Sequence, residues 1–497
     1  MPQRRTLTIV LACILTLSSS LSSSARLASS EKGIYARSGR AIQATALAIL
    51  NDRTITLDDI DPNVRELANR LDGEIVLARN RVLAEQIDVL LFDAEAGRRR
   101  ITINRLFEVE VKQRTVDPTA EEIQAIYDAN RAQFGAASLT TVRPQIVAYL
   151  RRESGQKLAT DLAARLRKRF PVVMGANVNS QTLSSSMTLA TVAGRTITAG
   201  TILDRLKPII YDLRSRVYEA VRAALDQLIY DLLVLAEARK RGVGPEVVIR
   251  KEVTDKGHAP TEEEITRFFD ENKARQNIDL AKARGQIASY LEQQEQVRLE
   301  QALSDKLRQG ASVRILIEEP EPPVLVISTD DDPSRGLANA PVTVVVFTDF
   351  QCPNCGLNHP MIEEVTRSYG NSVRLVIRDF PLDMHENALK AAEAANAAYA
   401  QGKFFEYAEL LFKNQQALDI SSLKKYATEI GLNRAKFDAA LAQGTYELEV
   451  SHDIADGMSY GVLGTPTVFV NGVRVNKLSS DTLRAAINRA LVKKNAS

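Results

Sequence analysis

A long internal repeat occupies most of this 497-residue chain before residue 318. RTIT at Arg53–Thr56 recurs at Arg195–Thr198, an offset of 142 residues. DPTAEEIQAIYDANRAQF recurs as APTEEEITRFFDENKARQ at the same offset, and PQIVAYL returns as GQIASYL at an offset of 141. A period this long indicates duplication of a domain and not a solenoid of short repeats.

The two copies, residues 43–175 and 187–317, are each expected to be mostly helical. A short β-like start precedes a long helix, about Asn63–Arg99 and Ile202–Arg241, in which apolar residues recur with helical spacing. The PTxEE sequence that follows in both copies fits a helix-capping box. A final helix and a short apolar tail (VVM or VRILI) close each copy.

This order of segments, with IYDAN or FFDEN followed by QIVAYL or QIASYL, resembles the helical chaperone domain of SurA-like periplasmic proteins. In those proteins the domain usually brackets a parvulin prolyl isomerase. The two copies here run almost end to end and leave no room for that enzyme, so prolyl isomerase activity is not expected. The resemblance implies modules that bind clients or act as scaffolds, and a purely structural or dimerising arm is the alternative.

The N-terminus has the features of a secretory signal over residues 1–25. A positive MPQRR precedes the apolar stretch Thr6–Leu17, which is too short to span a bilayer, and small residues follow at Ser23 and Ala25. Cys13 in VLAC weakly matches a lipoprotein cleavage site, so lipid anchoring is a secondary interpretation. We therefore expect a periplasmic or otherwise exported protein.

The cysteine count narrows the function further. The chain contains Cys13, Cys352 and Cys355, so removal of the signal leaves a single CxxC pair. Exported proteins often carry a framework of disulfides. A bridge across so short a loop constrains the unfolded chain little, which makes this pair a poor structural staple. The net charge of +2 and the lack of a basic tract give no indication of nucleic acid as a partner.

A Pro- and Glu-rich linker, EEPEPP at residues 318–323, separates the repeats from a region of different pattern. VLVIS and VTVVVFTDF are expected to form strands. The second contains a continuous run of β-branched residues, which indicates a strand buried on both faces. FQCPNC follows, then a helix that ends near Gly370. A strand is expected next at Ser372–Leu382, followed by a helical stretch at about 385–450. Gly461–Val475 is expected to return to β structure, and the C-terminus to form a last helix.

Several ordered motifs of this region, residues 324–494, closely resemble the DsbA-like thiol–disulfide oxidoreductases. They are FTDFQCPNCGLNH, RDFPLDMHENALKAAEAA, QGKFFEYAELLF and GVLGTPTVFVNG. The predicted fold class is therefore multidomain: two mostly α-helical repeats, then an α/β thioredoxin fold with a helical insertion at about 385–450.

The chemistry of a CxxC pair at a helix start agrees with this resemblance. Cys352 would lie where unpaired amides and the helix dipole favour a thiolate, which is the nucleophile of disulfide exchange. Pro353 suits the first helical turn, and Asn354 can offer a polar contact. The resemblance implies that Cys352 is the exposed attacking thiol and Cys355 the buried resolving thiol.

Thr465 and Pro466 form the expected second part of the site. The resemblance implies a cis peptide bond before Pro466, packed against the CxxC pair, with the backbone of Thr465 pairing with a substrate strand. An ordinary trans turn proline is the alternative.

The expectations for other residues near the pair are less specific. Val346 occupies the strand position where many thioredoxin relatives have a buried acid. Asp349 is not expected to be catalytic, because strand alternation can point it elsewhere. His359 is expected to be exposed or to cap a helix, with tuning of the thiols as the alternative, and His385 is expected to be structural.

No metal or other cofactor is expected. Cys352, Cys355 and His359 could supply three zinc ligands, but the sequence offers no fourth ligand at a suitable spacing. P-loop, GxGxxG and nucleophile-elbow motifs are absent from the sequence.

The resulting hypothesis is an exported thiol–disulfide oxidoreductase, either an oxidase or an isomerase. Its partners would be cysteine-containing unfolded or partly folded proteins and a membrane redox partner. Two alternatives stay open: a periplasmic holdase or scaffold whose thioredoxin-like domain mainly binds, and a reductase supplied by a membrane electron donor. The sequence gives no indication of the oligomeric state.

Overall fold

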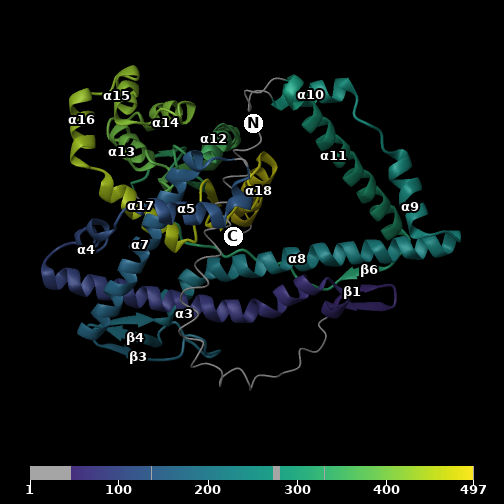
Figure 1. Cartoon of the computed structure of the whole chain (residues 1–497), viewed down its shortest axis with the longest axis horizontal. Coiled ribbons are helices and arrows are strands. Elements are labelled where there is room, and N and C mark those ends of the chain that lie inside the picture. Colours follow the sequence, from purple (N-terminus) through teal and green to yellow (C-terminus); the bar gives the residue numbers. More distant parts are fainter. Residues whose placement is uncertain (1–45, 136, 273–279, 330, 496–497) are drawn as a thin grey trace. The chain divides into compact units, whose positions relative to one another are not determined.

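The computed structural model describes residues 46–135, 137–272, 280–329 and 331–495, so the predicted signal and Cys13 lie outside the described residues. The chain divides into two compact units, one containing Val76–Leu206 and the other containing residues 46–75 and Lys207 onward. Figure 1 shows their elements in chain order. No helix in the described ranges is both long enough and apolar enough to cross a lipid bilayer.

The helical region runs through a similar series of helices twice, and among the described residues the short α6 occurs in the first series alone. The first series is α3 (Pro62–Arg99), α4 (Ile103–Glu110), α5 (Ala120–Ala129), α6 (Arg131–Phe134) and α7 (Leu139–Arg169). The second is α8 (Ala199–Arg241), α9 (Pro245–Glu252), α10 (Glu262–Asn272) and α11 (Leu280–Gln309). In both copies the long helix, the helix that starts at the PTxEE motif and the final helix therefore lie close to their predicted positions.

The predicted capping boxes at α5 and α10 are both present. The side chain of Thr119 accepts the backbone N–H of Glu122, whose carboxylate accepts the backbone N–H of Thr119 in return. Thr261 and Glu264 make the same two hydrogen bonds. Each box satisfies two amides that a helix start would otherwise leave unpaired.

Two small antiparallel sheets each combine strands from both sequence copies. One contains β3 (Val172–Met174), β4 (Thr188–Val192) and β5 (Arg195–Thr198), in that order. The other has the order β2 (Arg53–Thr56), β1 (Ala46–Leu50), β6 (Val313–Ile315). The hairpin that begins each copy is thus completed by the strand that ends the other copy.

The apolar stripe of α8 forms the core under the β1–β2 hairpin. Leu225, Ile229 and Leu233 are buried, and they pack with Leu47 and Ile55 of the hairpin. Burial of these large aliphatic side chains, at about 1.5–3 kcal/mol each, is what holds the short hairpin on the helix.

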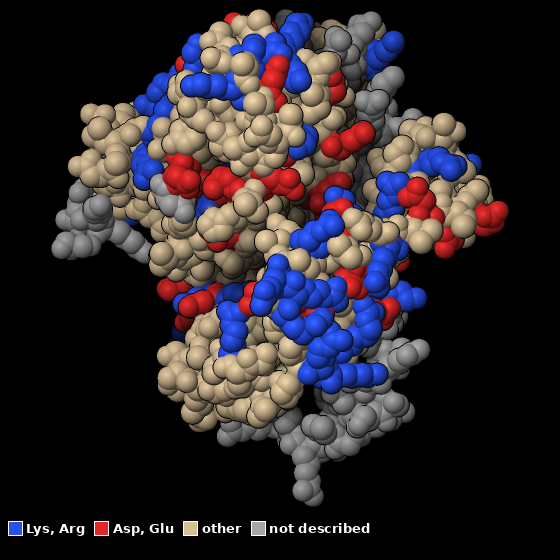
Figure 2. All heavy atoms as spheres, turned by 90° about the vertical axis from the view of Figure 1, so that its left-hand side faces the viewer, with Lys and Arg blue, Asp and Glu red and all other residues tan. Residues whose placement is uncertain are grey.

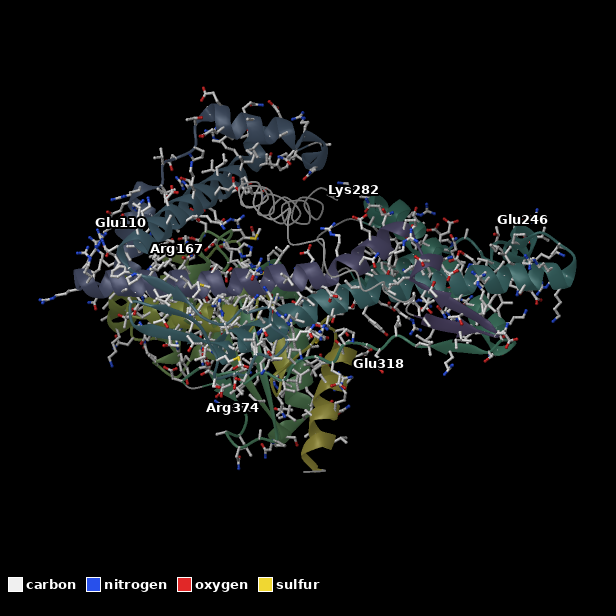
Figure 3. The ribbon with its side chains drawn as sticks, turned by 90° about the horizontal axis from the view of Figure 1, so that it is seen from below. Glu110, Arg167, Glu246, Lys282, Glu318 and Arg374 are labelled. Carbon is white, nitrogen blue, oxygen red and sulfur yellow. The ribbon has the colours of Figure 1, made fainter. Side chains whose placement is uncertain are left out.

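At the C-terminal end of α3, two buried glutamates each form ion pairs with several arginines. Glu95, whose side chain is fully buried, accepts hydrogen bonds from Arg98, Arg99 and Arg169. Glu110 of α4 pairs with Arg99 as well, and with two further arginines, Arg114 and Arg165. Figure 3 labels Glu110 and Arg167 near this end of α3, and Figure 2 shows Lys and Arg side chains gathered over one area of the surface.

The C-terminal domain is a five-stranded sheet with helices. Its strands are β7 (Ser334–Arg335), β8 (Val342–Thr348), β9 (Val373–Asp379), β10 (Thr467–Val470) and β11 (Val473–Arg474). Its helices are α12 (Pro353–Ser368), α13 (Ala388–Tyr399), α14 (Phe404–Lys413), α15 (Ile420–Glu429), α16 (Arg434–Gln443), α17 (Glu447–Ser459) and α18 (Ser480–Asn495). The strand order is β11-β10-β8-β9-β7, with β8 and β9 parallel and the other pairs antiparallel.

The central strand β8 is buried on both faces, as its β-branched run predicts. Val342, Val344 and Val346 join one apolar cluster, while Val345 and Phe347 join another. The predicted helical insertion is also present and extends to Ser459, beyond the expected end near residue 450.

The prediction of a strand at VLVIS is wrong. This segment makes one isolated bridge, between Val324 and Val473, and belongs to no named strand. Val326 is 93% exposed, whereas Leu325 and Ile327 pack against the domain's apolar cluster. The segment is therefore extended along the edge without the ladder of hydrogen bonds that defines a strand.

Candidate active site

The CxxC pair lies where β8 leads into α12. Cys352 is the N-cap of this helix and Pro353 is its first residue, where the missing N–H of proline costs no helical hydrogen bond. The backbone N–H of Cys352 donates to the carbonyl of Asp349 at 3.1 Å, and the carbonyl of Cys352 accepts the N–H of Gly356 at 3.1 Å. The predicted position at the start of a helix is confirmed.

Both cysteines are free thiols, and both are buried. Cys355 is 2% exposed, as expected, but Cys352 is only 5% exposed. The expectation of an exposed Cys352 is therefore wrong. Its sulfur lies against the loop before β10, where Sγ donates to the carbonyl of Thr465 at 3.4 Å.

The surroundings of the two thiols change their acidities in opposite directions. A hydrogen bond from the Cys355 thiol does most to lower the pKa of Cys352, to about 6, and the backbone amides of Cys355 and Asn354 lower it further against the effect of burial. Burial raises the pKa of Cys355, and the hydrogen bond and negative charge of Cys352 raise it more. Asn354 thus acts through its backbone amide, while its side chain is exposed.

The loop between α17 and β10 supplies the other wall of the site. The Thr465–Pro466 peptide bond is cis, which confirms the prediction for this bond. The carbonyl of Thr465 faces Cys352, and Pro466 lines the cavity next to Cys355.

A pair formed by the buried Asp349 and the half-buried His385 beside the CxxC loop was not predicted as part of the site. Asp349, 1% exposed, accepts the backbone N–H of Gln351 at 2.7 Å and that of Leu382 at 3.0 Å. Its Oδ2 also lies 2.6 Å from Nδ1 of His385. Burial alone would lower the pKa of His385, but the hydrogen bond to Asp349 and the charges of Asp349 and Cys352 raise it.

Gln415, between α14 and α15, also holds the CxxC loop. Its amide donates to the carbonyl of Phe350 at 2.9 Å and to that of Cys352 at 2.7 Å. A Cβ added at Gly356 would come within 2.4 Å of Oε1 of Gln415, so a glycine leaves room for this contact. No motif signalled Gln415, because its partners lie more than 60 residues away in the sequence.

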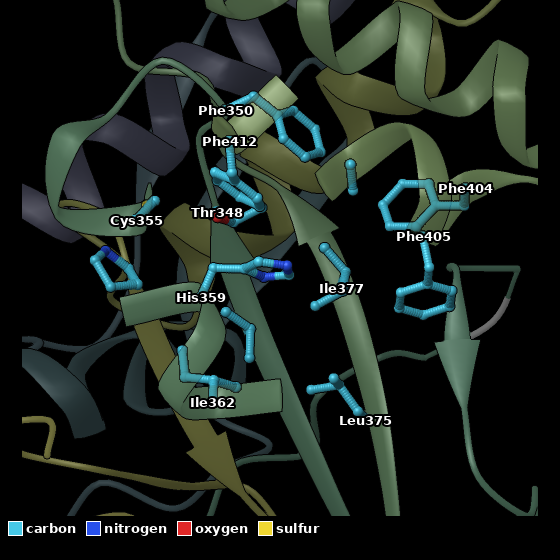
Figure 4. A pocket seen from close by; sticks show the side chains of 13 residues that line it. Thr348, Phe350, Cys355, His359, Ile362, Leu375, Ile377, Phe404, Phe405 and Phe412 are labelled. Carbon is cyan, nitrogen blue, oxygen red and sulfur yellow. The ribbon is translucent and has the colours of Figure 1, made fainter. Parts of the chain in front are cut away.

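A small cavity of about 10 Å³ lies beneath Cys355, and its wall is mostly apolar. Figure 4 shows its lining, which includes Phe350, Phe412, Thr348 and His359. Val346, at the strand position discussed above, lines the same space. The expectation of an exposed or capping His359 is wrong, because its ring is half-buried and stacks on Phe412 with centroids 4.4 Å apart.

Among the described residues, the group of carboxylates, thiols or imidazoles close enough to share a metal ion is Asp332, Glu449 and Asp453. The fully buried Arg378 already supplies positive charge there. Its guanidinium lies 3.1 Å from Asp332 and donates to Asp453 at 2.7 Å. We therefore interpret this group as an ion-pair network that joins β9 to α17.

Residues 328–489 match the protein family model described as thioredoxin. The C-terminal domain has a thioredoxin fold. The curated relatives of the chain include the Na(+)/H(+) antiporter NhaA 3 of Salinispora tropica, 42% identical over 149 residues, which make up 30% of this chain and 23% of that protein. The antiporter NhaA 1 of Salinispora arenicola is 39% identical over 33% of this chain and 25% of its own length. The chain therefore spans about a quarter of these relatives.

Solved structures similar to the chain include oxidised BdbD from Bacillus subtilis, with 22% identity and a TM-score of 0.32 over 35% of this chain and 99% of that chain. A thioredoxin-like oxidoreductase from Silicibacter pomeroyi is 26% identical, with a TM-score of 0.31 over 33% and 93%. A periplasmic thioredoxin-like protein from Salmonella enterica is 22% identical, with a TM-score of 0.28 over 33% and 91%.

Proposed function

We propose that this protein is an exported thiol–disulfide oxidoreductase that acts on protein substrates through Cys352 and Cys355. The observation that carries the proposal is the asymmetry of the pair, because Cys352 has a pKa lowered to about 6 while the pKa of Cys355 is raised. At neutral pH the Cys352 sulfur is then a thiolate, which is the reactive form, while Cys355 stays protonated as a thiol.

The exchange follows from this arrangement. The Cys352 thiolate attacks a client disulfide, so that a bond forms between Cys352 and one client sulfur while the other client sulfur leaves as a thiolate. Cys355 then loses its proton and attacks Cys352, which forms the Cys352–Cys355 disulfide and releases the second client sulfur. The reverse sequence oxidises a client dithiol. The backbone of Thr465 is the proposed partner of the client strand.

The helical repeats are proposed to hold unfolded or partly folded clients near the thiols, which would raise the effective concentration of client cysteines. Exposed apolar side chains on these helices, including Leu77, Val89, Tyr290 and Val297, provide contact points. The resemblance to SurA-like chaperone domains supports this part. Export, through a signal at residues 1–25 or a lipid anchor at Cys13, and supply by a membrane redox partner belong to the same proposal.

A holdase is the second candidate, since Cys352 is only 5% exposed. Equilibration of the pair with glutathione buffers separates the candidates. A potential near −120 mV would indicate an oxidant or isomerase, and one near −270 mV a reductase, by comparison with about −120 mV for DsbA and roughly −270 mV for thioredoxin. A wild-type pair that never equilibrates, together with a Cys352→Ser, Cys355→Ser variant that still suppresses aggregation, would favour the holdase.

The client-holding role has its own test. Deletion of residues 43–317 should leave exchange with a small disulfide unchanged and should slow exchange with a reduced, unfolded protein. Equal rates on the protein substrate before and after deletion would contradict the role of the repeats without affecting the redox proposal.

A further inference from the structure

Disulfide exchange at this site requires a path for one proton. Cys355 must lose its proton to attack Cys352 and must regain it when the disulfide is opened. The thiol is 2% exposed, so bulk water has little direct access to it. Once Cys352 is bonded to a client, its negative charge is gone, but burial still opposes ionisation of Cys355. A nearby group that accepts the proton would lower this barrier.

The cavity beneath Cys355 offers few candidates for that group. Its polar side chains are Thr348 and His359, and the remaining lining residues are apolar. No carboxylate lines it among the described residues. A hydroxyl is a poor base at neutral pH, whereas a neutral imidazole is a good one. His359 is therefore the suitable proton acceptor in this space.

The position of His359 suits transfer from Cys355. Both residues lie on α12, four residues apart, so their side chains emerge on the same side of the helix. Figure 4 shows the imidazole ring extending into the cavity near Thr348. The cavity volume of about 10 Å³ has room for roughly one water molecule, which is enough to bridge a thiol and a ring nitrogen.

His359 also lines a second, open groove on the outside of the domain. The other residues of this groove are Pro360, Glu363, Glu364, Arg367, Ser368 and Glu409. The same side chain thus borders both the buried cavity and a solvent-accessible, mainly acidic surface. A proton accepted on the inside has a way out that does not cross the Thr465 loop, where a client would lie.

The charge environment keeps the ring neutral and ready to accept. Burial lowers the pKa of His359, Glu363 and Glu409 partly oppose this, and Arg335 lowers it further. Arg335 comes from β7 and pairs with Glu363 at 2.7 Å, and Glu409 belongs to α14. Neighbouring elements therefore contribute charges of both signs around the ring.

We propose that His359 carries the Cys355 proton between the buried cavity and the outer groove. In the forward direction Cys355 transfers its proton to the free ring nitrogen through the bridging water, and the thiolate attacks Cys352. The client sulfur leaves as a thiolate, and the imidazolium releases its proton into the groove. When a client thiolate opens the Cys352–Cys355 disulfide, Cys355 regains a proton by the reverse path. This inference rests on the proposed redox function.

A two-step reaction of the reduced full chain with dithiobis(nitrobenzoate) tests it. Attack by Cys352 releases the first coloured thiolate, and attack by Cys355 on the mixed disulfide releases the second. In His359→Phe, which keeps an aromatic ring against Phe412, and in His359→Gln, we expect the first rate unchanged and the second reduced at least roughly tenfold at neutral pH. The matched control is His452→Gln, an exposed histidine of α17.

The pH profile separates proton transfer from a structural role. In the wild-type protein the second rate should rise through the pKa of His359 and then level off. In both variants it should keep rising with hydroxide concentration. An unchanged second rate, or equal slowing of both steps, would overturn the role of His359. A wild-type protein that never releases the second thiolate would instead contradict the proposed redox function.

Discussion

At the scale of single residues, two thiols one helical turn apart differ because their partners differ. Cys352 receives a hydrogen bond from Cys355 and faces helix amides, whereas Cys355 is enclosed by apolar side chains. Each thiol also changes the other, since a thiolate at Cys352 makes a second thiolate at Cys355 costly. The acidity of the site is therefore a property of the pair and not of either residue.

Replacement of Cys355 by Ala should raise the pKa of Cys352 above 6, toward the ordinary value of about 8.5, because the largest cause of the lowering is lost. The pH dependence of iodoacetamide alkylation, with the thiolate absorbance as a second readout, measures this pKa. A value that stays near 6 would mean that the helix amides alone set it.

The same lowering predicts a pH dependence of stability. The folded-state pKa of Cys352 lies below that of the unfolded chain, so the unfolded chain binds more protons between pH about 6 and about 8.5. The reduced protein should gain stability relative to the disulfide form as the pH rises through this window, and the gain should vanish below pH 6. Denaturant melts of both forms across this range provide the measurement.

At the scale of elements, charge pairing stabilises the end of α3. The hydrogen bond from Arg98, with those from Arg99 and Arg169, lowers the pKa of Glu95 to about 2. A carboxylate with a lowered pKa contributes stability above its ordinary pKa and loses it as the pH falls through the folded value. Here the loss should occur between pH about 4.5 and about 2.

Substitution of Glu95 by Gln should destabilise the helical region by about 2 kcal/mol at pH 7, since it leaves three arginines around an uncharged group. The partial exposure of these arginines limits the effect. Urea denaturation at pH 7 and at pH 3 measures it, and the cost should shrink at pH 3. Glu66→Gln on the exposed face of α3 is the control, with an expected change below about 0.5 kcal/mol.

The elements also show which features the sequence could predict. Signals confined to neighbouring residues were reliable: the capping boxes, the amphipathic helices, the central strand and the CxxC–helix junction. Features made by distant residues were missed, namely Gln415 on the CxxC loop, the Asp349–His385 pair and the burial of Cys352. The prediction of a strand at VLVIS was wrong for a related reason. Strand formation depends on a partner edge, which the composition of the segment does not encode.

At the scale of the whole molecule, the two sequence copies share their sheets. β6 of the second copy pairs with β1 of the first, and β3 of the first pairs with β4 of the second. Such sharing follows from no local pattern, so the sequence predicted two copies but not the exchange of strands between them.

Deletion of residues 187–317 alone should therefore be more harmful than deletion of 43–317. The shorter deletion leaves β3 without a partner, removes β6 from beside β1, and exposes the face of the hairpin that α8 covers. We expect an aggregation-prone product from the shorter deletion and a soluble thioredoxin domain from the longer one. Size-exclusion chromatography of both proteins is the measurement, and two equally soluble products would contradict the prediction.

Strand sharing also determines the order in which the two small sheets can form during synthesis of the chain. The ribosome makes the chain from the N-terminus, so β3, β4 and β5 leave it within a short interval and can pair at once. The β1–β2 hairpin emerges early but gains its third strand only after Val313 has been made. Until α8 has been made the nascent hairpin also lacks the apolar surface beneath it, and afterwards β1 still lacks β6. A chaperone that shields exposed strands would therefore have its longest opportunity at the start of this protein.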